Sequence, residues 1–366
     1  MDPFTHTFAG GLLASGGLRK VTPLAAAALL IGANIPDVDI VVSLMGEQAS
    51  VAHRRGWTHG VLAWVVLPLI LSAGLMLFAN IRARIKPATT IEPSFWPLLG
   101  LSLLAVLSHP LLDWLNNYGV RLLMPFDNRW FYGDTLFVLD PWVWLLLGGG
   151  YCYATSARRW QQLMWAVFWV VSSAVVCLNN FSTTATIVVW FIGLSSLLTL
   201  RIFVPGITPS SVARLALILG VGYIIINDIV SRFAAARVAD EMAARGLGDV
   251  ADIMVAPVPA NPFAGNVVVE FEDHYRLGAW HWLNNPHLSL KDEALTASMQ
   301  DVRVQAAAKA LAARRFLMWS RYPYATVTSG AEGGFQVQFD DARYAGEAGL
   351  IRGPLVVLDD NLQQIE

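Results

Sequence analysis

Long apolar runs constrain this chain more than any other feature of its sequence. The run VLAWVVLPLILSAGLMLFAN, from Val61 to Asn80, contains no charged residue, and about 20 apolar residues are needed to cross the hydrocarbon core of a bilayer. Only 14% of the 366 residues are charged, whereas a soluble protein is about one quarter charged. The sequence therefore predicts an integral membrane protein. Spans are expected at 60–80, 97–118, 136–157, 160–178, 184–204 and 212–231.

Two shorter apolar segments, Phe8–Leu18 and Leu24–Asn34, precede these spans. Their Gly and Ala content permits close packing, so we expect a short helical hairpin. After about Ser231 the composition changes, and strand-like patterns at 252–280, 335–344 and 354–360 flank a helical pattern at 298–319. We therefore expect an all-α polytopic membrane protein with a small C-terminal soluble α+β domain, divided into 1–232 and 233–366.

The distribution of basic residues predicts the orientation in a bacterial inner membrane. Arg82, Arg84, Arg158 and Arg159 fall on one side if the spans alternate, and that side is expected to be cytoplasmic. The opposite side carries the polar motifs described next and the soluble domain, so both are expected to be periplasmic or extracellular. Four arginines also lie on this outer side: Arg54, Arg55, Arg121 and Arg129.

The motif SHPLLDWLNN places His109 and Asp113 four residues apart. On a helix this spacing puts both side chains on one face, and Asn117 would continue the stripe. An imidazole and a carboxylate so placed can bind one metal ion. The alternative is a His–Asp hydrogen bond at a helix end without a metal.

Two other motifs carry His and Asp residues. In NIPDVD, Pro36 is expected to end the helix, so that Asp37 and Asp39 lie in a turn as metal ligands or as an ordinary polar cap. In HRRGWTHG, Gly56 is expected to turn the chain between His53 in a loop and His59 in the first turn of the next span. The alternative is two interfacial histidines, one hydrogen-bonded by Thr58.

Together, these motifs are stronger evidence for a metal site than any one of them alone. Four of the seven histidines fall in the first 109 residues, although His6, alone at a helix start, is by itself more often structural. All four map to the face that carries the three aspartates. Mixed His and carboxylate sites suit zinc, manganese or iron, and the two cysteines lie in apolar runs. We expect one or two divalent ions, zinc first, with this ligand set: His6, Asp37, Asp39, His53, His59, His109 and Asp113.

Two aspartates, Asp134 and Asp140, and the three histidines of the tail were also considered. Asp134 and Asp140 begin the expected 136–157 span, and Asp140 before Pro141 is read first as a helix cap. Either could also join the site. The tail histidines His274, His281 and His287 are interpreted as structural or surface residues.

In chain order, THTFAGG, NIPDVD, HRRGWTHG, SHPLLDWLNNYG and VLDPW resemble the YdjM-like family of membrane-bound metal-dependent hydrolases. The tail motif PVPANPF looks like that family's long members. The family is more distantly similar to zinc-dependent phospholipases C and single-strand nucleases, whose zinc ions are held by His and Asp, including an H-x-x-x-D helix pair. The resemblance implies metal-dependent hydrolysis at a membrane face and assigns ligand positions to His6, Asp37, His59, His109 and Asp113. No second His pair with a Glu follows Asp113, so a full three-zinc site is not implied.

The leading hypothesis is a metal-dependent membrane hydrolase of a phosphoester in a lipid or lipid-linked substrate. Asp37 or Asp39 would act as general base, and Arg54, Arg55 and Asn117 would bind the substrate anion. The net charge of −2 gives no reason to expect nucleic-acid binding, and the oligomeric state is left open. The alternatives are a scaffold or stress-response protein with a structural metal, and a proton or metal transporter.

Overall fold

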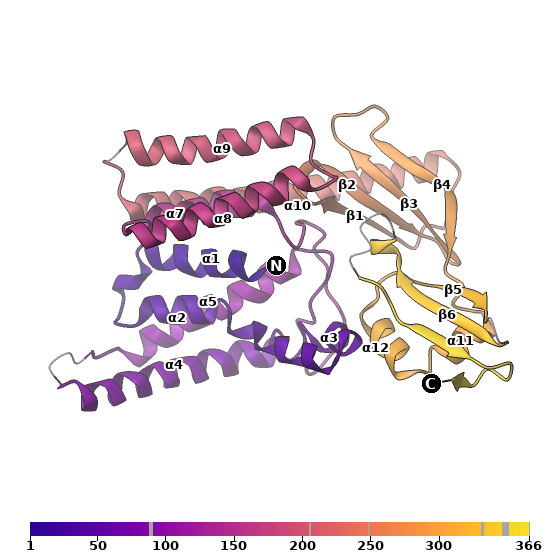
Figure 1. Ribbon diagram of the computed structural model, residues 1–366, viewed down its shortest axis with the longest axis horizontal. Helices are drawn as coiled ribbons and strands as arrows, with labels where there is room; N and C mark the ends of the chain where they lie inside the picture. The colour runs from indigo at the N-terminus through magenta and orange to yellow at the C-terminus, as the bar shows by residue number, and fades with distance from the viewer. Residues whose placement is uncertain (88–90, 205, 248, 331–332, 346–350, 366) are drawn as a thin grey trace. The chain divides into compact units, whose positions relative to one another are not determined.

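The computed structural model describes residues 1–366 apart from 88–90, 205, 248, 331–332, 346–350 and 366 (Figure 1). The chain divides into two compact units. The first contains Met1–Val38, Arg55–Ile229 and Val258–Pro262. The second contains Asp39–Arg54, Val230–Pro257 and Phe263–Glu366. The segments 39–54 and 258–262 thus cross the boundary that the sequence suggested at 232/233.

The first unit is helical, and its long helices run side by side in Figure 1. Its elements are α1 (Pro3–Ser15), η1 (Leu18–Lys20), α2 (Ala25–Gly32), the start of η2 (Ile35–Met45), α4 (Val61–Ile85), α5 (Phe95–Trp114), α6 (Pro141–Val143), the π-helical η4 (Trp144–Gly148), α7 (Gly149–Thr155), α8 (Arg159–Leu178), α9 (Thr184–Phe203) and most of α10 (Pro209–Ala244).

The predicted N-terminal hairpin is confirmed as α1 and α2, which pack against each other. The carboxylate of Asp2 accepts hydrogen bonds from the backbone N–H groups of Phe4 and Thr5 and so caps α1. A Cβ atom at Gly10 would lie 2.6 Å from the carbonyl oxygen of Leu29. Glycine at this position therefore permits the close approach of the two helices.

Among the described residues, six helical segments are long and apolar enough to cross a membrane: Ala25–Met45, Val61–Ile85, Phe95–Trp114, Arg159–Leu178, Thr184–Phe203 and Pro209–Ala244. The polytopic fold is thereby confirmed, but two segments differ from the prediction. Ala25–Met45, which begins with the second arm of the expected short hairpin, is a candidate span, and the stretch 136–157 is not. The stretch expected to span at 136–157 is helical only from Pro141 to Thr155, because Asp140 caps the helix start. Its side chains Trp144 and Leu147 are buried in the helical core, so this segment packs inside the unit.

The second unit is the predicted α+β domain. Two four-stranded antiparallel sheets follow the orders β1-β2-β3-β4 and β5-β6-β7-β8, and α3 packs against α12. The elements are α3 (Glu47–His53), β1 (Asp252–Val258), β2 (Asn261–Glu270), β3 (His274–His281), β4 (Leu288–Thr296), α11 (Val302–Ala307), α12 (Leu311–Trp319), β5 (Pro323–Ser329), β6 (Phe335–Asp341), η5 (Ala342–Tyr344), β7 (Leu355–Leu358) and β8 (Gln364–Ile365). The strands β4, β5 and β8 were not predicted.

The chain leaves the first unit along α10, which is one continuous helix from Pro209 to Ala244. The residues from Ser231 to Ala244, where the composition changes, form the last turns of this helix. Its buried residues Ala234, Val238 and Met242 pack with Val255 and Val267 of the first sheet. The end of α10 is therefore part of the core of the second unit.

Candidate metal centre

Three separate segments of the first unit supply the central side chains. His109 and Asp113 lie one turn apart on α5, and the i to i+4 spacing aims both from one helix face. Asp37 lies in the first turn of η2, directly after α2. His59 precedes Gly60, the N-cap residue of α4. Helix ends and a helix face thus converge on one point.

The ligand atoms of these four residues all lie within 4.8 Å of one another. Nε2 of His109 is 3.1 Å from Nε2 of His59, 3.6 Å from Oδ2 of Asp113 and 3.7 Å from Oδ1 of Asp37. Nε2 of His59 is 3.2 Å from Oδ2 of Asp113. His59, His109 and Asp113 are at most 1% exposed, whereas the side chain of Asp37 is 19% exposed.

This spacing fits a four-coordinate ion. Zinc lies about 2.0 to 2.2 Å from its nitrogen and oxygen ligands, which in a tetrahedron separates neighbouring ligand atoms by roughly 3.3 to 3.6 Å. The measured separations of 3.1 to 3.7 Å bracket this range. Two imidazoles and two carboxylates are also a donor set that zinc accepts.

The outer partners of the two histidines also suit metal binding. Nδ1 of His109 lies 2.7 Å from the carbonyl oxygen of Ala33. A carbonyl only accepts hydrogen bonds, so Nδ1 carries the proton and Nε2 directs its lone pair toward the cluster. Nδ1 of His59 lies 2.9 Å from Oγ1 of Thr58. A hydrogen bond from Thr58 to one histidine of HRRGWTHG was expected in the alternative without a metal, and the structure shows it at His59.

Arg55 pairs with the oxygen of the Asp113 carboxylate that also faces His59 and His109. Its Nε lies 3.1 Å from Oδ2 of Asp113, its Nη1 donates to Oδ1 of Asn116 at 3.0 Å, and its guanidinium lies 4.6 Å from the centre of the Tyr118 ring. Arg55 is itself 7% exposed. The buried negative charge of Asp113 is thus paired with a buried positive charge.

His6 of α1 lies beside the four central residues. Its ring stacks on that of His109 with centroids 3.7 Å apart, and its Nε2 is 3.4 Å from Oδ1 of Asp113. The side chain is fully buried, and within the described residues neither ring nitrogen has a hydrogen-bond partner. The α-amino group of Met1 also contacts Oδ1 of Asp113. A metal ion bound beside His6 and Asp113 would give the His6 nitrogen nearest the four central residues a partner.

Three of the residues predicted from the sequence belong to the second unit. These are Asp39, His53 and Arg54. Nε of Arg54 lies 3.6 Å from Oδ1 of Asp39, and His53 is the last residue of α3 and not a loop residue. The structure therefore brings Asp37, His59, His109 and Asp113 together with His6 and Arg55.

Two local expectations differ from the structure. The helix α5 ends at Trp114, so Asn117 does not continue the stripe of His109 and Asp113, although its side chain is buried. In the turn before α4 it is Arg55, with φ of 52°, and not Gly56, that adopts the left-handed conformation. The role of Gly56 is steric, because a Cβ atom there would lie 2.5 Å from Nη2 of Arg121.

The sequence patterns did not identify Asn116 and Ala33 as part of the site. Asn116 accepts from both Arg55 and the backbone N–H of Tyr118, and Ala33 acts through its carbonyl group. The Asn-Asn pair after the His–Asp motif was a signal for a polar residue, but only the end of α5 decides which of the two it is. A backbone carbonyl leaves no signal in a sequence. Asp140, in contrast, caps α6 as preferred from the sequence.

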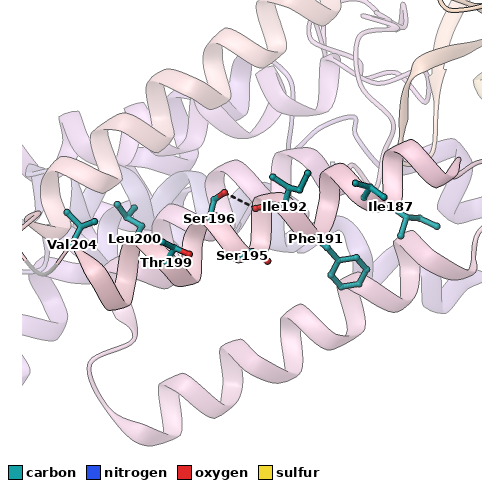
Figure 2. A pocket seen from close by; sticks show the side chains of 9 residues that line it. Ile187, Phe191, Ile192, Ser195, Ser196, Thr199, Leu200 and Val204 are labelled. Carbon is teal, nitrogen blue, oxygen red and sulfur yellow. Dashed lines mark hydrogen bonds between the residues drawn. The ribbon is translucent and has the colours of Figure 1, made fainter.

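A separate hollow lies along α9. Figure 2 shows it lined by apolar side chains such as Ile187, Phe191 and Leu200, with the hydroxyl groups of Ser195 and Thr199 among them. Its lining includes none of the residues of the candidate metal centre. The hollow is therefore no part of that centre.

The comparisons with known proteins agree with this architecture. The family model described as YdjM inner membrane protein matches residues 1–185. The uncharacterized protein YfhP of Bacillus subtilis (strain 168) is 28% identical over 155 residues, which are 40% of this chain and 43% of that protein. The chain thus matches less than half the length of this curated relative. No solved structure matches the chain.

Proposed function

The chain belongs to the YdjM inner membrane protein family, and from this premise we propose that it is a membrane-embedded metal-dependent hydrolase. One observation carries the proposal. The ligand atoms of Asp37, His59, His109 and Asp113 all lie within 4.8 Å of one another, and four of the separations are 3.1 to 3.7 Å, close to those in a zinc site. When bound there, a divalent ion supplies Lewis acidity and activates water at neutral pH.

The ligands differ in their access to solvent, which suggests their roles. Asp113 is 1% exposed and is held by Arg55, so it anchors the ion. Asp37 is the most exposed of the four. With His59, His109 and Asp113 as the three ligands, the fourth position would be open to water, and the Asp37 carboxylate would accept a proton from that water as general base. His6 is a fifth ligand or the first ligand of a second ion.

The substrate that fits best is a phosphoester in a lipid or a lipid-linked molecule. The centre lies between membrane helices, and His and Asp sites of this kind are common in phosphoester hydrolysis. Asn117 is a candidate contact of the anion, since its amide group can donate hydrogen bonds to phosphate oxygens. Arg55 is already engaged with Asp113 and Asn116, so we assign it first to holding the ligand. Zinc is the first choice of metal, followed by manganese and iron. We place the centre at the periplasmic face of the inner membrane.

The proposal is tested on the purified full chain in detergent, with metal content and hydrolysis of lipid and generic phosphoesters measured before and after chelation. The His109→Ala/Asp113→Ala double variant should lose at least about tenfold in metal affinity and lose the hydrolysis that chelation removes. The matched control is His274→Ala/Asp273→Ala, which removes another His–Asp pair, 2.7 Å apart, from the second unit. Full metal content in the first double variant would refute the site.

A second function is a non-enzymatic scaffold whose metal is structural. The observation that favours it is the burial of His6, His59, His109 and Asp113, all at most 1% exposed, because closed four-ligand sites are typical of structural zinc. This function predicts stoichiometric metal without any chelator-sensitive hydrolysis. It also predicts that chelation lowers the unfolding temperature of the helical unit.

A further inference from the structure

The second unit contains an aromatic pocket that the metal chemistry does not use. It has a volume of about 500 Å³ and lies between the last turns of α10 and the hairpin that joins β3 to β4. Three aromatic rings and an imidazole line it: Phe233, Trp280, Trp282 and His287. We define this group, with the charged residues described below, as the aromatic pocket.

The rings contact one another and line the pocket. Trp280 stacks on His287 with centroids 5.4 Å apart and meets Trp282 edge-on at 5.3 Å. Phe233 lies 5.9 Å from Trp282. The faces of such rings carry negative potential, so ring faces that line the pocket can attract an alkylammonium cation.

Positively and negatively charged side chains line the α10 side of the pocket. Arg237, Asp240 and Glu241 line it together with Phe233, and the spacing of four, seven and eight residues from Phe233 puts them on one helix face. The guanidinium of Arg237 already lies 5.1 Å from the centre of the Phe233 ring. Asp240 is 75% exposed on its side chain and Arg237 is 59% exposed. Arg237 and Asp240 lie 4.0 Å apart as an ion pair, and Glu241 pairs with Arg245 at 2.9 Å. Exposed pairs of this kind contribute little stability, so the charges of a ligand can replace them.

The indole N–H of Trp280 is a further unused group. Trp280 is 4% exposed, and among the described residues its Nε1 finds no acceptor. A buried donor without an acceptor is unfavourable, so an oxygen atom of a ligand that moves in beside the indole would be stabilised there. A simple cation brings no such oxygen, whereas a phosphate does.

We propose that the aromatic pocket binds a phosphorylated alkylammonium group of the phosphoethanolamine or phosphocholine type. The ammonium lies against the rings and the carboxylates of Asp240 and Glu241, and the phosphate faces Arg237 and the Trp280 indole. Phe233 follows directly after the apolar part of α10, a candidate membrane span. The group can therefore come from a lipid headgroup or from a soluble phosphate ester. This binding is independent of the metal centre.

The test uses the full chain in dodecyl maltoside, labelled with 5-fluorotryptophan and observed by fluorine NMR. Signals of Trp280 and Trp282 are assigned with Trp280→Phe and Trp282→Phe. Phosphocholine and phosphoethanolamine should shift both signals saturably, and Trp282→Leu should weaken binding by about tenfold, the scale of a desolvated cation–π contact. Tetramethylammonium and inorganic phosphate, the two halves of the ligand, should each bind more weakly.

Two controls keep the outcome clear. Trp160→Leu removes a tryptophan of α8 that is 60% exposed and should leave binding unchanged. Trp282 packs on the core of the second unit, so Asp240→Asn, at an exposed side chain, serves as a second variant and should also weaken binding. Unfolding temperatures of all variants report whether they fold.

Micelles doped with phosphatidylethanolamine or with phosphatidylglycerol distinguish the two sources. A response to the doped ethanolamine lipid alone identifies a membrane headgroup, and an equal response to the soluble ester identifies a soluble ligand. The proposal is overturned if no probe shifts the two signals, if tetramethylammonium binds as tightly as phosphocholine, or if folded Trp282→Leu and Asp240→Asn bind like the unmodified chain.

Discussion

Arg55 combines an unusual backbone conformation with an unusual position. Its φ of 52° is in the left-handed region, which costs a residue with a side chain about 1 kcal/mol or more. Its guanidinium reaches Asp113, Asn116 and the face of Tyr118. Strain of this kind persists where the surrounding contacts outweigh it. We infer that the turn is held by the pairing of Arg55 with Asp113.

Arg55→Ala should leave the Asp113 carboxylate buried without its partner. Loss of one partner of a buried ion pair typically destabilises by about 3–5 kcal/mol. A bound divalent ion also neutralises this carboxylate, so the variant should gain more stability from added zinc than the unmodified chain does. Unfolding temperatures with and without chelator measure this difference.

The control for this experiment is Arg129→Ala. Arg129 pairs with Asp127 at 2.6 Å, but its side chain is 72% exposed, and exposed pairs contribute about 0–1 kcal/mol. Equal zinc responses in both variants would contradict the assignment of Arg55 to the metal centre.

Asp341 and Arg343 form a buried ion pair in the second unit, with Oδ1 and Nε 2.9 Å apart. Burial by itself would raise the pKa of Asp341, but the Arg343 guanidinium and further hydrogen bonds hold this pKa below its ordinary value. A carboxyl whose pKa is lowered by folding contributes stability above its unfolded pKa, near 3.9, and this stability is lost as the pH falls through the folded pKa.

The second unit should therefore lose stability below about pH 4, where Asp341 is protonated more readily in the unfolded chain. Hydrogen exchange of peptides from β6, measured between neutral and acidic pH, follows this loss. Asp341→Asn should flatten the acid dependence and lower stability at neutral pH. An unchanged acid profile in this variant would show that other carboxyl groups control it.

Close helix packing connects elements that carry the candidate ligands. A Cβ atom at Gly32 would lie 2.8 Å from Cβ of Ala105, which brings α2 against α5. Gly10 does the same for α1 and α2. These contacts set the distances between His6 on α1, Asp37 after α2 and His109 on α5. Small residues far from any ligand thus determine the geometry of the centre.

Gly10→Leu should separate α1 from α2, because no space exists beside the Leu29 carbonyl. Overpacking of this kind costs about 1–3 kcal/mol, and it should move His6 off the ring of His109. We expect a lower unfolding temperature and weaker metal binding in a competition assay with a chromophoric chelator.

Gly100→Ala is the matched control, since no atom lies within 4 Å of a Cβ atom built at this helical glycine. It should be neutral or stabilising by roughly 0.5–1 kcal/mol, because alanine favours a helix. If the two variants behave alike, the packing of α1 on α2 does not control the centre.

On the scale of the whole molecule, the family match and the metal centre coincide. Residues 1–185 include every candidate ligand of the first unit and Arg55. The aromatic pocket, from Phe233 to Leu288, lies beyond the matched residues. The two proposals therefore concern parts of the chain with different relationships to known proteins. The metal centre and the aromatic pocket can each be tested without assuming the other.

The orientation of the molecule is a prediction of the Lys/Arg bias. A C-terminal alkaline phosphatase fusion, active only outside the cytoplasm, should be active in cells. A fluorescent protein that folds only in the cytoplasm should be dark at the same position. Activity of the second reporter, with an inactive first one, would place the second unit in the cytoplasm.

Much of the architecture followed from sequence patterns. Apolar runs of membrane length identified five of the candidate spans, because burial in lipid requires uninterrupted apolar length. The predicted span at 136–157 was wrong, because a helix buried among other helices is as apolar as a helix in lipid, and composition does not separate the two. The strands β4 and β5 escaped it because their exposed faces carry polar and charged residues, such as Lys291 and Asp292.

The sequence by itself determined the class of the protein, the residue types of the candidate centre and the His–Asp pair on α5. These features depend on local spacing along the chain. Only the tertiary structure decided which residues meet, because the contacts of Asp37, His59 and His109 join segments far apart in sequence. It also decided that Arg55 faces Asp113 and that the Ala33 carbonyl orients His109. Backbone groups and helix ends set these contacts, and neither can be read from residue types alone.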